Sequence, residues 1–82
     1  MKYYVYVIGT LTPLRKTYVG WTNDLDNRLQ KHNSSKGAKS TRGSEWQFLH
    51  KEELESKSAA MKREYQLKRD QKFRSKLRLL IL

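Results

Sequence analysis

Residues 16–33, KTYVGWTNDLDNRLQKHN, join a strand pattern directly to a helix pattern. Residues 16–21 are rich in β-branched and aromatic side chains, which predicts a strand. Thr22 or Asn23 then offers a helix cap, and Asp24 and Asp26 fall in the first turn, where carboxylates complement the helix dipole. The helix is expected to run to about residue 32. Its apolar stripe is thin and consists of Leu25 and Leu29.

The segments on either side extend this unit. Residues 3–8, YYVYVI, predict another strand that ends at Gly9, and residues 10–15 predict the loop of a hairpin. On the other side, residues 33–43, NSSKGAKSTRG, lack a hydrophobic period and predict a loop. Residues 46–50, WQFLH, predict a third strand, which a polar segment at 51–57 follows.

Two more helices are expected near the C-terminal end. Ser56 or Ser58 can cap a helix that runs to about residue 69, and Asp70 or Gln71 can begin another. The apolar residues of this last helix recur at helical spacing and are Phe73, Leu77, Leu80 and Ile81. The order ββαβαα predicts a small α+β domain over residues 1–82, with a three-stranded antiparallel sheet flanked by helices.

Length and cysteine content limit the class of protein. A chain of 82 residues can bury only a modest core, so one domain is expected. The chain has no cysteine, which excludes disulfides and cysteine-based zinc sites and favours a cytoplasmic protein. The apolar run at 79–82 is far shorter than the ~20 residues of a membrane-spanning helix.

The net charge of +10 predicts a polyanionic partner. The charge is concentrated, because residues 35–43 hold three basic and no acidic side chains, while residues 58–82 hold eight basic and two acidic ones. DNA is the expected partner and RNA the alternative; a merely basic soluble surface is a third interpretation. An anionic membrane is not expected, since no segment joins a basic face to a broad apolar one.

Strand alternation places two tyrosines near a glycine. Tyr6 in the first strand and Tyr18 in the second can lie close together if the hairpin pairs in register, and Gly20 would leave open space beside them. Taken alone, the tyrosines are also ordinary strand residues, and Gly20 is equally consistent with a bulge or a close helix approach.

The helix that follows adds two polar groups on one side. Arg28 and His32 are spaced i, i+4 and therefore project together, beside the apolar stripe. Asp24 precedes Arg28 by four residues, so a weak surface ion pair is an alternative interpretation of Arg28.

Glu64 interrupts an inward-facing stripe of the second helix. Ala60, Met61 and Leu67 surround it at helical spacing, and a carboxylate there needs a partner because burying an unpaired charge is costly. Lys68, Arg28 or a divalent cation would serve. One carboxylate with substrate phosphates and water is the usual protein share of a magnesium site.

Together these groups are suited to metal-assisted cleavage of a phosphodiester. Glu64 would hold the cation, Arg28 would stabilise developing phosphate charge, and a tyrosine or His32 would move a proton. A tyrosine has an unperturbed pKa of ~10, which nearby cations such as Arg28 would lower.

In this order, Tyr4-Val5-Tyr6, Tyr18-Val19-Gly20, Arg28 with His32, and Glu64 resemble the GIY-YIG nuclease domain. The segments TNDLDNRLQKHN, KGAKSTRG and AAMKREYQLKR resemble the short stand-alone bacterial members. The resemblance implies a DNA endonuclease that uses one divalent ion, Mg²⁺ or Mn²⁺.

The resemblance also implies residue roles. Tyr6 and Tyr18 match tyrosines that position or deprotonate the attacking water, and Arg28 matches the arginine beside the scissile phosphate. His32 matches a proton-transfer candidate, and Glu64 matches the metal ligand. The predicted nucleic-acid contacts are Lys36, Lys39, Arg42 and Lys68.

The chain departs from the family pattern at two points. Tyr4 replaces the first glycine of the motif, which would narrow the active face, and an asparagine that follows the glutamate in longer members has no clear match. The extra DNA-binding domains of larger members are also missing, so substrate choice would come from this domain or from a protein partner. Branched or damaged DNA is the candidate substrate. The alternatives are a basic binding module without turnover and a basic structural protein of a ribonucleoprotein.

Overall fold

A computed structural model describes residues 2–10, 16–34 and 45–79 of the chain. The predicted order ββαβαα is confirmed, and the protein has an α+β fold. The elements are β1 (Tyr3–Thr10), β2 (Thr17–Thr22), α1 (Leu25–Asn33), β3 (Trp46–Leu54), α2 (Lys57–Arg69) and α3 (Gln71–Arg78).

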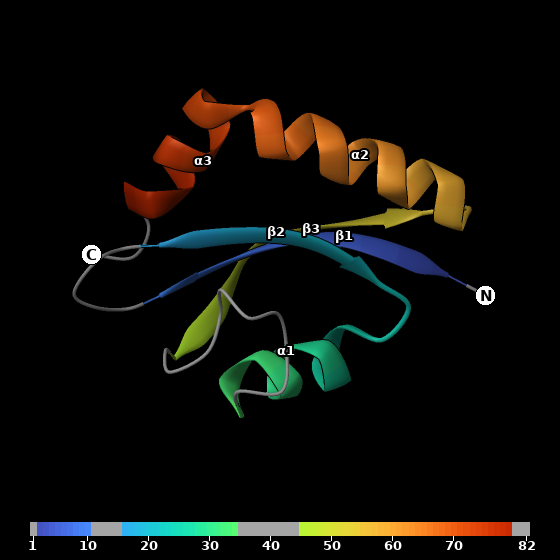
Figure 1. The fold of residues 1–82 in the computed structure, drawn as a ribbon, viewed down its shortest axis with the longest axis horizontal. Coiled ribbons are helices and arrows are strands. Elements are labelled where there is room, and N and C mark those ends of the chain that lie inside the picture. The colour runs from blue at the N-terminus through green and yellow to red at the C-terminus, as the bar shows by residue number, and fades with distance from the viewer. Residues whose placement is uncertain (1, 11–15, 35–44, 80–82) are drawn as a thin grey trace.

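The three strands form an antiparallel sheet in the order β2-β1-β3. The central strand β1 is buried from Val5 to Thr10 because it has a neighbouring strand on each side and helices on both faces. Figure 1 shows α1 beneath the sheet and α2 with α3 above it. No helix in the described ranges is long and apolar enough to cross a membrane.

Alternation along β1 divides the core into two clusters. Val5 and Val7 point towards α2, where they pack with Val19, Ala60 and Leu67. Tyr6 and Ile8 of the same strand point towards α1. They form a second cluster with Tyr18, Leu25, Leu29, Trp46 and Phe48. The thin stripe of α1 is therefore enough to anchor that helix.

A bulge in β3 changes which side chains face each helix layer. Val7 pairs with His50, but the next residue, Ile8, pairs with Phe48, so Leu49 is an extra residue in the ladder. Phe48 packs in the core cluster that faces α1, whereas Leu49 packs in the core cluster that faces α2. The ring of His50 lies edge-on to Phe73 of α3, at a centroid distance of 4.9 Å.

The third strand is longer than its sequence pattern predicts. Residues 51–54 were expected to lie outside the strand because they are mostly polar, and that expectation is wrong: they pair with Tyr3 to Tyr6 of β1. Glu52 is accommodated on the α2 side because Arg63 binds it, with Nε 2.9 Å from Oε1 and Nη2 3.0 Å from Oε2.

The first helix begins later than expected. Asp24 is its cap, accepting a hydrogen bond from the backbone N–H of Asn27 at 3.2 Å, so the prediction of Thr22 or Asn23 is wrong. Thr22 instead accepts from the backbone N–H of Asp24. The caps Ser56 and Asp70 are confirmed by bonds to Ala59 and Phe73. Predictions for residues 11–15, 35–43 and 80–81 fall outside the described residues.

Candidate active site

Tyr6 occupies the centre of the polar cluster. It lies in β1, points towards α1 and is only 1% exposed. Gly20 of β2 is its partner in the ladder, and a Cβ atom at Gly20 would lie 2.5 Å from the Tyr6 hydroxyl and 3.0 Å from the Tyr18 ring. Since real Cβ atoms do not approach so closely, Gly20 provides clearance for Tyr6, as predicted. The pairing there is regular, so the bulge alternative is wrong.

Arg28 and His32 both bind the Tyr6 hydroxyl, which confirms that they project together from α1. Arg28 Nε donates to this oxygen at 3.2 Å, and His32 Nε2 lies 2.9 Å from it. The phenol oxygen can accept from Arg28 and donate its own hydrogen to His32 at the same time. That arrangement requires the tautomer of His32 whose proton is on Nδ1.

The histidine is held neutral by its surroundings. His32 is fully buried, and burial together with the positive charge of Arg28 lowers its pKa to about 4. A neutral imidazole is the form that can accept the proton of Tyr6 in a hydrogen bond. The electrostatics of the site thus agree with its hydrogen-bond geometry.

The pKa of Tyr6 moves in the direction opposite to that expected. Burial raises it to about 12, and this effect exceeds the lowering by the hydrogen bond and charge of Arg28. The neighbouring Tyr18 and Glu64 raise it further. The expectation that cations lower the tyrosine pKa is therefore wrong for Tyr6, because the cost of an ionised phenol in a buried position is greater.

Arg28 retains its positive charge for an external anion. Burial alone would lower its pKa, but the hydrogen bond to Tyr6 and the nearby phenol of Tyr18 outweigh that effect, and the pKa is raised. Asp24 uses its carboxylate to cap α1, so the alternative of an Asp24–Arg28 pair is wrong. None of the ion pairs found in the described ranges involves Arg28.

Tyr18 completes the group on the α1 side of the sheet. Its ring centroid lies 6.4 Å from that of Tyr6 and 5.0 Å from that of His32. Tyr18 is half-buried on β2, which is an edge strand, whereas Tyr6 is enclosed in the central strand. Four of the predicted site residues, Tyr6, Tyr18, Arg28 and His32, are thus brought together.

Glu64 approaches from the opposite layer. It lies on α2, its side chain is 22% exposed, and Lys68 Nζ is 3.4 Å from its Oε1, as the ion-pair alternative predicts. Its negative charge also contributes to the raised pKa of Tyr6, so the carboxylate acts electrostatically on the site. On the same helix, Lys57 lies over the Trp21 ring of β2 at 5.4 Å, so this side of α2 runs along β2.

A metal ion would have few protein ligands here. In the part of the chain that the structure describes, no group of three or more His, Asp or Glu side chains could hold one. Glu64 is partly exposed and bound only loosely to Lys68, which suits a single-carboxylate magnesium site completed by substrate phosphate and water. Lys36, Lys39 and Arg42 lie outside the described residues.

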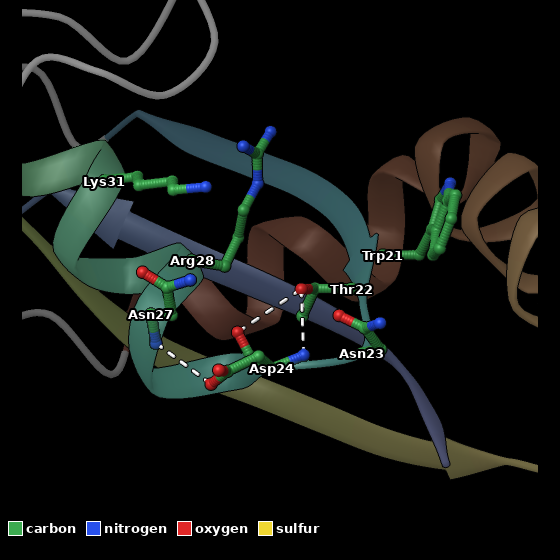
Figure 2. A pocket seen from close by; sticks show the side chains of 7 residues that line it. All are labelled: Trp21, Thr22, Asn23, Asp24, Asn27, Arg28 and Lys31. Carbon is green, nitrogen blue, oxygen red and sulfur yellow. Dashed lines mark hydrogen bonds between the residues drawn. The ribbon is translucent and has the colours of Figure 1, made fainter. Parts of the chain in front are cut away.

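The sequence pattern did not identify a pocket beside Arg28. The pocket has a volume of about 300 Å³, and Figure 2 shows Arg28 and Lys31 extending from the same side of α1 beside it. Asn27, the end of β2 and the β2–α1 connection form the rest of its lining. The i, i+3 spacing of Arg28 and Lys31 was the available signal. Tyr4, expected to narrow this face, pairs with Thr22 and is not part of the lining.

Comparisons with known proteins show the family of the chain. The family model described as the GIY-YIG catalytic domain matches residues 2–78. A UPF0213 protein of Oceanobacillus iheyensis is 39% identical over 80 residues, covering 96% of this chain and 90% of the relative. A UPF0213 protein of Natronomonas pharaonis is 39% identical over 67 residues, covering 80% of this chain and 76% of the relative.

A solved structure is also similar. The solution NMR structure of a UPF0213 protein from Bacillus halodurans is 35% identical, covers 98% of this chain and 85% of that one, and superposes with a TM-score of 0.55. The agreement extends over the strands and helices that carry the tyrosines, the arginine and the glutamate. The chain therefore belongs to the GIY-YIG catalytic domain family, and its relatives within that family are UPF0213 proteins.

Proposed function

We propose that the protein is a metal-dependent endonuclease that hydrolyses phosphodiester bonds in DNA. The family membership suggests a nuclease. The observation that carries the proposal is the Tyr6–Arg28–His32 network, which holds a charged guanidinium beside β2 while Glu64 approaches from α2. In this proposal Arg28 supplies a fixed cation and Glu64 supplies a carboxylate to the bound phosphate.

In this proposal Arg28 stabilises the charge that develops on the phosphate. Its Nε donates a hydrogen bond to a neutral, buried phenol and not to a carboxylate. The guanidinium is therefore oriented while its positive charge is not neutralised. A donor that is already oriented needs no reorganisation in the transition state, which is the main source of electrostatic catalysis. Tyr6 is then a positioning residue for Arg28.

The raised pKa of Tyr6 argues against its use as the general base, because an efficient base has a pKa near the working pH. His32 is fully enclosed and forms a hydrogen bond with the Tyr6 hydroxyl, so we assign it to the support of that phenol. Tyr18, which is half-buried on the edge strand, is the tyrosine that can meet the attacking water.

Glu64 would hold the divalent ion, Mg²⁺ or Mn²⁺. The bound ion would supply Lewis-acid stabilisation of the phosphate oxygens and activation of water. Displacing Lys68 from the carboxylate frees the lysine for a neighbouring phosphate, in line with its predicted role in nucleic-acid binding.

The enzymatic proposal is tested by incubating the pure protein with flap, junction and plain duplex DNA in the presence of Mg²⁺. We expect wild-type cleavage, and a loss of at least about 100-fold for Glu64→Gln and Arg28→Ala, as for loss of a preorganised stabilising group. Lys62→Gln, which alters an exposed lysine on α2, serves as the control and should cleave normally. Absence of wild-type cleavage, or equal cleavage by Glu64→Gln, would refute the proposal.

A non-catalytic binding module is the second candidate, because the net charge of +10 supports DNA binding with or without turnover. It predicts salt-sensitive DNA binding that does not change in Glu64→Gln or Tyr18→Phe. A ribonucleoprotein component would instead prefer RNA to DNA in the same assay. The branched or damaged substrate, a protein partner that confers specificity and a cytoplasmic location remain predictions.

A further inference from the structure

The pocket beside Arg28 has the composition of an anion site. Its lining includes two cations, Arg28 and Lys31, and one carboxylate, Asp24. Asp24 is held by the backbone N–H of Asn27 as the cap of α1, and the ion pairs found in the described ranges include neither Arg28 nor Lys31. The pocket thus carries an unneutralised positive charge, which favours a phosphate group.

The rest of the lining is polar except for Trp21, and it is suited to a base or a sugar. Asn27 is exposed on α1, and Asn23 lies in the β2–α1 connection. Side-chain amides provide both donors and acceptors, the combination that base edges and sugar hydroxyls require. The volume of about 300 Å³ is at the lower limit of the ~300–1,000 Å³ of small-molecule sites, so the pocket suits one nucleotide.

Arg28 connects this pocket to the proposed catalytic group. It donates to Tyr6 and also lines the pocket, while Lys31 lies one turn further along α1 on the same side (Figure 2). Residues at i and i+3 have Cβ atoms about 5–6 Å apart, which is comparable with the step between successive phosphates of a nucleic-acid strand. A strand whose scissile phosphate is bound by Arg28 would therefore bring the next phosphate to Lys31.

We propose that this pocket binds the nucleotide next to the scissile phosphate, with Lys31 on its phosphate and the amides of Asn23 and Asn27 on its base or sugar. The inference rests on the proposed endonuclease function and assigns positioning of the strand to residues that take no part in the chemical step. It predicts that an isolated deoxynucleotide binds here without metal and without cleavage.

The test is a titration of the ¹⁵N-labelled full chain with thymidine 5′-monophosphate in EDTA, followed by NMR. Amide shifts should cluster at residues 22–31. Asn27→Phe, which fills the pocket, should weaken binding at least fivefold, and Lys31→Gln should weaken it at least threefold. Gln30→Phe is the matched control, because Gln30 is exposed on the same helix but does not line the pocket, and it should bind as wild type.

The pocket assignment is overturned if Asn27→Phe and Gln30→Phe bind the nucleotide equally, or if the shifts cluster elsewhere. Circular dichroism of each variant separates loss of binding from loss of folding. Because no cleavage is measured, the result is independent of turnover. A chain that binds the nucleotide here yet never cuts DNA would contradict the proposed function alone.

Discussion

At the scale of single residues, the site depends on a glycine that makes room for a phenol. The Tyr6 hydroxyl passes so close to Gly20 that any side chain there would displace it. Arg28 and His32 are then oriented by that hydroxyl rather than by each other. The position of the proposed phosphate-binding group is therefore set by a buried residue that the substrate does not touch.

The buried His32 predicts a specific dependence of stability on pH. Its folded-state pKa of about 4 is below the unfolded value of ~6.5, so the folded state disfavours the proton. The stabilisation is complete above pH ~6.5 and is lost as the pH falls towards 4. We expect the free energy of unfolding to decrease by about 3 kcal/mol over this range.

This dependence can be measured by urea unfolding at several pH values. In His32→Gln, which keeps a hydrogen-bond acceptor for Tyr6 but cannot titrate, the decrease between pH 6.5 and 4 should be smaller by that amount. An identical pH dependence in the two proteins would show that His32 is accessible to protons in the folded state.

The residue pattern predicted which side chains meet, but not their protonation. Helical spacing placed Arg28 beside His32, and strand alternation placed Tyr6 near Tyr18, since both periods follow directly from the backbone. The pKa values depend on how completely side chains from α1 and β3 enclose the phenol and the imidazole. That enclosure is a tertiary property, which no local window of sequence contains.

At the scale of elements, one charged contact fixes α2 to β3. Arg63 of α2 contacts both carboxylate oxygens of Glu52, and His50 Nε2 lies 2.7 Å from Oε2 of the same group. These contacts lower the pKa of Glu52, with the hydrogen bond from Arg63 as the main cause. The stabilisation is thus present at neutral pH and is lost as the pH falls below the ordinary range of a glutamate.

A pair of neighbouring substitutions tests this contact. Glu52→Gln should lower the free energy of unfolding at pH 7 by about 1–2 kcal/mol, because a charged, bidentate hydrogen bond is replaced by a weaker one. Glu53→Gln is the matched control, since Glu53 forms an exposed pair with Lys2 that contributes little. Equal effects in chemical denaturation would mean that the Arg63 contact does not stabilise the docking of α2.

The order and the approximate limits of the elements could be predicted from the sequence. The end of β3 could not, because residues 51–54 carry three charged side chains, and the partners that make a strand acceptable there lie on β1 and α2. Such long-range compensation cannot be read from local composition. The same reason explains why the pocket was not predicted, because its lining comes from a strand end, a connection and a helix.

At the scale of the whole molecule, basic side chains and the candidate active site both lie around the edge of the sheet that β2 forms. Arg28 and Lys31 lie on the α1 side of β2, while Lys57 and Lys68 lie along α2 on the other side. A polyanion that crosses this edge would contact cations from both layers. Such contacts release counterions and make binding dependent on salt.

The basic loop that the sequence predicts at residues 33–43 should contribute to this salt dependence. Combined replacement of Lys36, Lys39 and Arg42 by Gln should make the slope of log K against log salt shallower by about 2.7 for duplex DNA, at about 0.9 per phosphate contact. The slope is measured by fluorescence anisotropy in EDTA. Replacing Lys62, Lys72 and Lys76 by Gln removes the same charge from exposed helix positions and is the control. Equal changes in both variants would indicate that only net charge matters.

The extra residue in β3 also constrains how this chain can change in length. Removing Leu49 would restore strict alternation and leave residues 50–54 with their present partners on β1 and on their present faces, because Phe48 and His50 already pair with adjacent residues of that strand. The cost would be one apolar side chain from the core that faces α2. The bulge is therefore the place in β3 where the strand can lose a residue without exchanging inside and outside.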